Sequence, residues 1–267
     1  MKKLEHCWTY ISDSEKGRKT PEEIAANASP PTIANYVQLR EKIARVSFYN
    51  PEYTLFFRGQ HADHKVAGCS SLFPEIYRYL RNEKPGTATR QLRLRILERA
   101  ETLLLQSLRT AYTPKKSFKR STRLVGFSKM KMFQELQWAV LQHYRVCRTP
   151  LLDVTHSLRT SCAFALNRNK SEQGYLYVLA APHPTGSISY YVEDRMLTIR
   201  LASICAPKAL RPHFQDALLL GNFPLRYDNK GRLLFKSLED FDFKQRLVAK
   251  FKLVKNGFWE KSGGKPT

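Results

Sequence analysis

The chain has 267 residues, of which 42% are hydrophobic and 12% aromatic, so it can bury the core of a large globular domain. This composition excludes a disordered basic tail. Lys and Arg number 45 against 23 Asp and Glu, and a net charge of +22 predicts an anionic partner. Nucleic acid is the first candidate, and the alternative is that the charge only keeps the protein soluble.

The cysteines and the N-terminus indicate the compartment. Five cysteines are scattered along the chain without a C-x-x-C pair, which disfavours a disulfide framework and a zinc ribbon. The start lacks the apolar run of a signal peptide, and no apolar stretch is long enough to span a bilayer. We therefore expect a cytoplasmic protein with reduced thiols and no membrane partner.

The first predicted elements lead into a sheet. Residues 11–31 are polar and contain three prolines, which predicts an extended segment. Apolar residues then recur with helical period over about 32–46, which predicts a helix. The aromatic run from Tyr53 to Phe57 predicts the first strand, with Arg58 at its end.

Two amphipathic helices and a second strand follow. Helical periodicity covers residues 88–110 and again 131–144, where the second pattern ends in Gln142-His143-Tyr144. Residues 150–155 read as a short buried strand, and a helix follows from Ser157, a candidate N-cap, to about Leu166.

The C-terminal part is predicted to contain three strands and a helix. Residues 174–180, 187–192 and 196–202 are rich in β-branched and aromatic side chains, which favours strands. The segment Ser-Leu-Glu-Asp from Ser237 resembles a capping box and predicts a closing helix to about Val254.

A basic interval lies between the first two long helices. It contains no acid from Glu101 to Glu135, and its aromatic side chains stand among cations as single-stranded nucleic acid would require for stacking. The alternative is a solvated loop whose aromatic residues anchor it to the core. The candidate nucleic-acid-binding residues are Arg109, Lys115, Lys116, Lys119, Arg120 and Arg123.

Arg58 and Gly59 predict an anion site. A guanidinium at the end of a strand suits a phosphate or pyrophosphate, and a glycine beside it lets a ligand approach the backbone. The alternative is an arginine paired with a structural carboxylate.

The sequence gives little indication of a metal site or of a catalytic cysteine. His61, His64 and Cys69 lack a fourth ligand at zinc spacing, so no metal is expected. His143 and Cys147 are four residues apart, but the helix is predicted to end between them, which disfavours a cysteine hydrolase.

Several motifs together resemble the FRG-domain family, which is named for its Phe-Arg-Gly opening. They run from about Tyr53 to Phe223, and their joint spacing is more specific than any one of them. They are Leu55-Phe56-Phe57-Arg58-Gly59-Gln60, Ser71-Leu72-Phe73-Pro74, Tyr77-Arg78, Leu141-Gln142-His143-Tyr144, Pro150-Leu151-Leu152-Asp153-Val154-Thr155, Ala163-Phe164-Ala165 and Gly174-Tyr175-Leu176-Tyr177-Val178.

The chain departs from the family's pattern at four places. Arg145 stands where the family has a glycine after Tyr144, Pro150 replaces a common arginine, and Val154 replaces a tryptophan. Asp216-Ala217 interrupts the usual Gln-Gly ending. These differences affect the predicted shape of the pocket.

The resemblance implies an α+β fold with a split central β-sheet, as in ADP-ribosyltransferases, and NAD as the substrate. Such a layout has Arg58 on the NAD pyrophosphate, Tyr144 against the nicotinamide, and Asp153 with Thr155 around the nicotinamide ribose. The implied NAD-binding residues are Phe57, Arg58, Gly59, Gln60, Tyr144, Asp153 and Thr155, and the implied catalytic residues are Arg58, His143, Asp153 and Gln215.

Some of these roles have alternatives. Gln215 occupies the place of the usual glutamate, but an amide cannot act as a base, so either Asp216 or His143 supplies that function or the enzyme works without it. His143 could equally be a satisfied histidine at a helix end. Asp153 could be an N-cap or a buried partner of Arg58.

The expected organisation is a lead-in over 1–50, an FRG domain over 51–227 with a basic helical insertion at about 88–131, and a C-terminal segment, 228–267, packed on the same domain. The expected function is ADP-ribosyl transfer from NAD to nucleic acid, in a toxin or phage-defence setting with an antitoxin or defence partner. The alternatives are a non-catalytic nucleic-acid-binding module and an NAD hydrolase.

Overall fold

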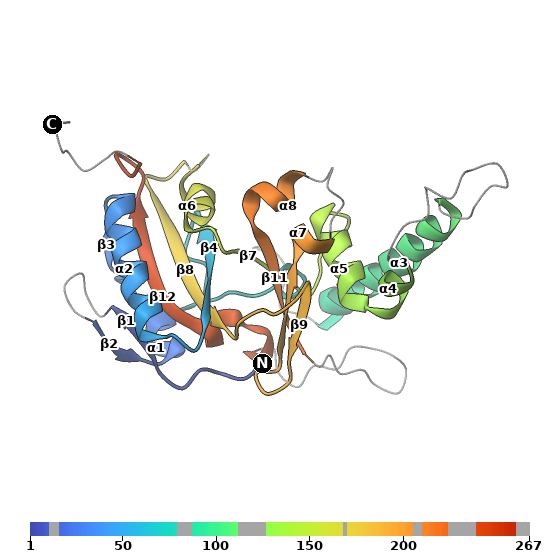
Figure 1. The fold of residues 1–267 in the computed structure, drawn as a ribbon, viewed down its shortest axis with the longest axis horizontal. Coiled ribbons are helices and arrows are strands. Elements are labelled where there is room, and N and C mark those ends of the chain that lie inside the picture. Colours follow the sequence, from blue (N-terminus) through green and yellow to red (C-terminus); the bar gives the residue numbers. More distant parts are fainter. Residues whose placement is uncertain are drawn as a thin grey trace. The chain divides into compact units, whose positions relative to one another are not determined.

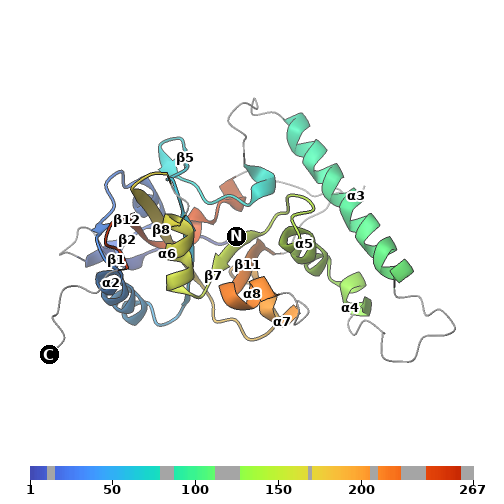
Figure 2. The ribbon, with the colours of Figure 1, turned by 90° about the horizontal axis from the view of Figure 1, so that it is seen from above.

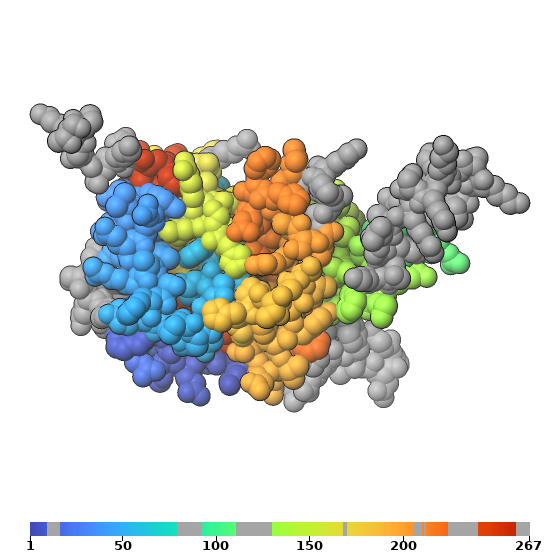
Figure 3. Space-filling view, viewed as in Figure 1, coloured from blue at the N-terminus to red at the C-terminus, as the bar shows by residue number. Residues whose placement is uncertain are grey.

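A computed structural model describes residues 1–10, 16–78, 87–111, 127–167, 170–204, 210–223 and 239–259. The chain divides into two compact units, one of residues 1–73 and 152–267 and one of residues 74–151. Figure 3 shows that the first unit is built from both ends of the chain, because blue to cyan and yellow to red segments share one face. The basic positions 115–123 lie outside the described residues, as does Ser237.

The first unit is organised around one eight-stranded mixed sheet (Figure 1). Neighbouring strands are antiparallel except for the parallel pair of β3 and β12. In sheet order the strands are β3 (Thr32–Ile33), β12 (Leu247–Val254), β8 (Gln173–Ala181), β4 (Thr54–Gln60), β7 (Leu152–Thr155), β11 (Ala217–Asn222), β10 (Met196–Arg200) and β9 (Ile188–Tyr191).

The pairing between neighbouring strands is shortest in the middle of the sheet. Strands β4 and β7 pair at one position, Phe57 opposite Thr155, whereas β4 pairs with β8 along its whole length. Four strands therefore lie on each side of a short junction. The predicted α+β class is confirmed, since helices accompany a large mixed sheet.

Helices cover both faces of the sheet. Helices α2 (Tyr36–Tyr49) and α6 (Leu158–Leu166) share one core with Leu55 and Phe57 of β4. Helix α1 (Pro21–Ala26) shares the opposite core with Phe56, as the alternation of a strand requires. Figure 2 shows α6 between α2 and the short helix α8 (Leu210–Gln215).

The N-terminal segment differs from the extended lead-in that we predicted. Strands β1 (Cys7–Tyr10) and β2 (Lys16–Lys19) form a hairpin, and α1 follows. Thr20 and Glu23 make a reciprocal capping box, and Pro21 occupies the first turn, where its missing N–H costs nothing. The prediction was wrong here because prolines were read as breakers, although one of them starts a helix.

The helix predicted over 32–46 begins later, at Tyr36. Thr32 and Ile33 join the sheet as β3, and the Asn35 side chain caps the helix by accepting from the Gln38 backbone N–H at 2.9 Å. The helix then continues to Tyr49.

The closing helix predicted to end at Val254 was wrong. Two short 3-10 helices, η3 (Glu239–Phe241) and η4 (Phe243–Arg246), precede strand β12. Asp242 caps η4 by accepting from the Lys244 backbone N–H. Strand β12 is mostly buried, and periodicity cannot distinguish its largely apolar sequence, interrupted by Lys250 and Lys252, from a buried helix.

Helix α6 and strands β7 to β10 follow their predictions closely. Ser157 is the N-cap of α6 and accepts from the Thr160 backbone N–H at 3.2 Å. Strands β7, β8, β9 and β10 lie within or close to their predicted ranges, and β10 passes directly into helix α7 (Leu201–Ile204). A small hairpin of β5 (Lys65–Val66) and β6 (Cys69–Ser70) follows β4. The elements β5, β6, α7, α8 and β11 were not predicted.

The second unit is helical. It contains the 3-10 helix η1 (Glu75–Tyr77) and the helices α3 (Thr87–Ala111), α4 (Phe127–Met132) and α5 (Gln134–His143). Helix α3 matches its prediction, but the single helix expected over 131–144 is broken at Phe133, whose backbone is extended. The Glu101 carboxylate accepts from Trp138 and Gln134, and burial raises its pKa. No helix within the described ranges is both long and apolar enough to cross a membrane.

Candidate site at the junction of the two half-sheets

The register of three strands brings predicted site residues together. Thr155 at the end of β7 lies opposite Phe57 of β4 on one side and Ala217 of β11 on the other. Arg58 follows Phe57 directly, and Gln215 precedes Ala217 by two residues. The junction therefore gathers residues that are almost 160 positions apart in the sequence.

Arg58 bridges the point where the two half-sheets separate. Its guanidinium Nη1 donates to the backbone carbonyl of Asp153 at 2.5 Å, and the side chain is half-buried. We predicted Arg58 at the end of its strand. Strand β4 continues to Gln60, however, so Arg58 lies inside it. Asp153 itself is exposed, and the contact that Arg58 makes here is with its carbonyl.

Thr155 joins the ends of β7 and β11. Its buried hydroxyl donates to the Gln215 carbonyl at 2.6 Å and accepts from the Ser157 backbone N–H at 2.9 Å. Asp216, the next residue after Gln215, is exposed and adopts a left-handed conformation with φ of 42°. The Gln215 side chain is half-buried and adjoins this turn.

His156 belongs to the same junction and was missed by the sequence reasoning. Its ring stacks on Phe56 with centroids 4.7 Å apart, and its backbone N–H donates to the Asp216 carbonyl at 3.4 Å. Burial lowers the pKa of His156, and Asp216 opposes that effect only in part. Nε2 is buried and has no hydrogen-bond partner among the described residues. The junction thus holds a neutral imidazole. A single histidine after a strand belongs to no motif, so the sequence did not indicate it.

A glycine is required at position 59 for a different reason from the one we predicted, which was the approach of a ligand. A Cβ at this position would lie 1.8 Å from the Ser161 carbonyl oxygen and 2.9 Å from the Ala165 backbone nitrogen. Gly174 of β8 admits the same helix, since its Cβ would lie 2.5 Å from the Ala165 carbonyl. The backbone that approaches Gly59 is therefore that of α6, which glycines allow to pack directly on the sheet.

A polar row crosses the sheet from Arg58. Tyr177 of β8 lies opposite both Arg58 of β4 and Lys250 of β12, and cross-strand partners project from the same face. The Tyr177 hydroxyl donates to Asp63 Oδ1 at 2.8 Å, and Ser70 donates to the same oxygen at 2.6 Å. Burial raises the pKa of Tyr177.

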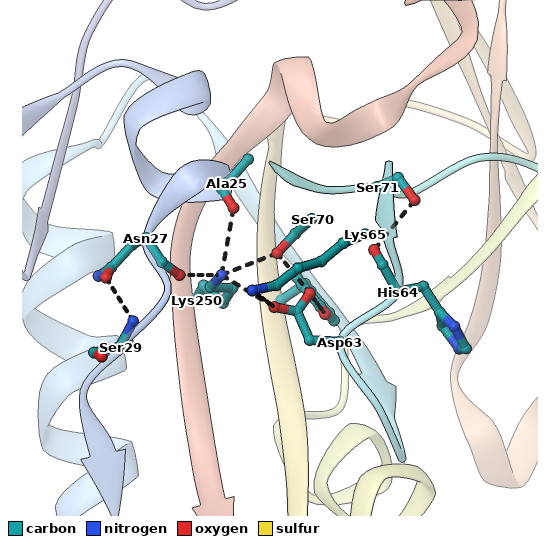
Figure 4. Close-up of polar contacts among 10 residues, drawn as sticks. Ala25, Asn27, Ser29, Asp63, His64, Lys65, Ser70, Ser71 and Lys250 are labelled. Carbon is teal, nitrogen blue, oxygen red and sulfur yellow. Dashed lines mark hydrogen bonds and ion pairs between the residues drawn. The ribbon is translucent and has the colours of Figure 1, made fainter. Parts of the chain in front are cut away.

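Lys250 lies at the centre of this cluster (Figure 4). Its ammonium group donates to the Asn27 carbonyl at 2.6 Å, to Ser70 Oγ at 2.9 Å, and to Asp63 Oδ2 and the Ala25 carbonyl at 3.4 Å each. Burial lowers the pKa of Lys250, and the Asp63 carboxylate opposes that effect. The cluster fastens α1 and the β5–β6 hairpin to the sheet beside the candidate site.

His143 and Tyr144 belong to the second unit, at the end of α5. The His143 ring is half-buried and contacts Tyr144 edge-on at 4.9 Å, while 64% of Tyr144 is exposed. Arg145 and Val146 donate to the Gln142 and Leu141 carbonyls, the two bonds of a Schellman motif. Arg145 has φ of 56°, a left-handed conformation that glycine adopts without strain.

The alternative sites find little support in the described residues. Burial raises the pKa of Cys147 to about 11, which keeps its thiol protonated and unreactive. His61 Nε2 is within hydrogen-bond distance of the Asn167 carbonyl, at 3.1 Å. The described residues include no group of three or more His, Cys, Asp and Glu arranged to hold a metal ion.

Of the predicted nucleic-acid-binding residues, Arg109 lies within the described ranges. It is exposed in the last turn of α3. The others, Lys115 to Arg123, fall outside those ranges, so their role stays a prediction.

Residues 53–174 match the family model of the FRG domain. This is the family that the motifs around Arg58, Tyr144 and Thr155 resemble. No curated protein and no solved structure matches the chain.

Proposed function

Since the chain carries an FRG domain, we propose that it is an NAD-dependent ADP-ribosyltransferase that modifies nucleic acid. The observation that carries the proposal is the chain of contacts across this junction: Arg58 of β4 donates to the Asp153 carbonyl of β7, and Thr155 at the end of β7 donates to the Gln215 carbonyl just before β11. An arginine on a first strand, a threonine at the end of a second and a polar residue before a third is the layout of ADP-ribosyltransferases.

The chemistry asks little of the protein beyond positioning. NAD carries a positively charged nicotinamide, so cleavage of the bond between the ribose C1 and the nicotinamide nitrogen leaves an oxocarbenium-like centre and neutral nicotinamide. An acceptor nucleophile then bonds to C1 and loses its proton. A guanidinium such as that of Arg58 can hold the pyrophosphate, provided that it exchanges the Asp153 carbonyl for phosphate oxygens.

Gln215 and its neighbours would act on the ribose. Its amide can hydrogen-bond a ribose hydroxyl but cannot accept the proton of the acceptor. Asp216 and His156 adjoin it, and burial keeps the His156 imidazole, which the sequence reasoning did not consider, neutral by lowering its pKa. The exposed Asp153 would face the ribose, and the buried Thr155 would hold the Gln215 backbone in place. The catalytic role predicted for His143, a residue of the second unit, stays a prediction.

The net charge of +22 supports nucleic acid as the acceptor. The setting that we propose is a cytoplasmic toxin or phage-defence effector held in check by a partner protein. The second candidate is a non-catalytic nucleic-acid-binding module whose Arg58 site holds a phosphate, and the absence of a carboxylate at position 215 favours it.

Transfer of label separates these functions. The protein is incubated with NAD labelled on the adenylate phosphate and with single-stranded DNA, RNA or no nucleic acid. We expect labelled nucleic acid with the wild type and none with Arg58→Ala, while Arg45→Ala, which removes an exposed arginine of α2, keeps full transfer. Equal labelling by Arg58→Ala would reject the site, and no labelling by any variant would favour the binding module.

A further inference from the structure

An aromatic and cationic cluster stands on the surface of the first unit. Trp259, in the turn after β12, is 43% exposed and lies 5.4 Å from the Tyr36 ring of α2, centroid to centroid. The Arg159 guanidinium of α6 lies 5.7 Å from the centroid of the Trp259 ring, within cation–π range. We call Tyr36, Arg40, Arg159 and Trp259 the aromatic platform.

The platform is built on fixed backbone. The Tyr36 N–H donates to the Phe258 carbonyl at 2.9 Å, which fastens the start of α2 to the turn that carries Trp259. Phe258 is fully buried and meets the Trp259 ring edge-on at 5.1 Å. The indole therefore rests against buried aromatic surface, although 43% of Trp259 is exposed.

Two guanidinium groups accompany the rings. Arg40 is one helical turn after Tyr36, and Arg159 is in the first turn of α6, and both are exposed. Both also lower the pKa of Tyr36, against a larger rise caused by burial, so both act on the same hydroxyl. Flat aromatic surface beside permanent cations is what a base and its phosphate require together.

We propose that the aromatic platform binds single-stranded nucleic acid by stacking a base on Trp259 and placing its phosphate between Arg40 and Arg159. A duplex does not fit this geometry, because its bases are stacked on each other. The inference rests on the proposed nucleic-acid acceptor and names the surface that holds it. Arg159 follows Thr155 by four residues, at the start of the helix that packs on Gly59, so the platform and the candidate site share helix α6.

The test measures binding without NAD, so that failure of the platform and failure of ADP-ribosyl transfer are distinguishable. Fluorescence anisotropy follows a labelled 20-nucleotide single strand, as DNA and as RNA, and the corresponding duplex at low salt. We expect Trp259→Ala to weaken single-strand binding about ten-fold and Trp259→Phe to keep most of it. Arg159→Ala should weaken binding and reduce its salt dependence.

The matched control is Phe48→Ala, which removes an aromatic side chain of α2 that is 77% exposed and lies outside the platform. It should bind as the wild type does, and thermal unfolding checks that each variant is folded. The proposal is overturned if Trp259→Ala binds single strands normally, if Phe48→Ala loses as much, or if duplex binding falls equally. It is also overturned if the wild type binds neither single strand.

Discussion

Lys250 offers the sharpest test of how the sheet is held together beside the candidate site. Its side chain is 1% exposed and that of Asp63 is 8% exposed, so the pair is removed from water. Lys250→Met keeps the length of the stem but removes the buried cation from two backbone carbonyls and from the Asp63 carboxylate, which keeps only the exposed Lys65 at 4.0 Å. Breaking a buried pair by removing one partner costs about 3–5 kcal/mol of unfolding free energy.

Lys65→Met is the matched control. Lys65 lies 4.0 Å from the same Asp63 carboxylate, but its side chain is 41% exposed, and such pairs contribute about 0.2–1 kcal/mol. Urea unfolding followed by circular dichroism gives both values. We also expect Asp63→Asn with Lys250→Met to cost less than the sum of the single changes, because they share one interaction. A loss in Lys250→Met no larger than that in Lys65→Met would refute this reasoning.

Three further predictions concern the junction and α5. Gly59→Ala should destabilise the fold by more than about 2 kcal/mol, because its Cβ would meet the Ser161 carbonyl at 1.8 Å; an unchanged melting temperature would contradict this. Arg145→Gly should raise the unfolding free energy by about 0.5–1 kcal/mol, since φ of 56° costs an L-residue more than glycine loses in entropy; urea unfolding measures it, and destabilisation would count against the Schellman assignment. The pKa of His156 is lowered in the folded state, so its contribution to stability is present above its unfolded pKa, near 6.5, and is lost as pH falls through the lowered value. His156→Phe should therefore lose less stability than the wild type between about pH 6.5 and 5 in thermal unfolding, and parallel curves would disprove the burial argument.

Local patterns were sufficient for the elements that carry the candidate site. The run Leu55–Phe57 is apolar throughout because β4 is covered by helices on both faces, and this predicted the strand that holds Arg58. Ser157 predicted the start of α6 because capping is a contact within four residues. The family motifs added which distant segments belong together, and Thr155 opposite Phe57 agrees with that grouping.

The contacts that fix the site are long-range and could not be predicted. Gly59 was expected to admit a ligand, but what approaches it is a helix one hundred residues later. The segment around Lys250 was predicted to be a helix. The two carbonyls and the carboxylate that compensate for burying this lysine belong to residues 25–63, so no local pattern around Lys250 indicates them. His156 shows no motif, and only the register of β4, β7 and β11 places it beside Phe56 and Asp216.

The stoichiometry of the reaction tests the central claim most directly. Nicotinamide release and ADP-ribose attached to a single-stranded oligonucleotide are quantified in one reaction by chromatography and mass spectrometry. We expect equal amounts of the two products with the wild type and neither with folded Arg58→Ala. Free ADP-ribose without modified oligonucleotide, or no release of nicotinamide at all, would contradict an ADP-ribosyltransferase centred on Arg58.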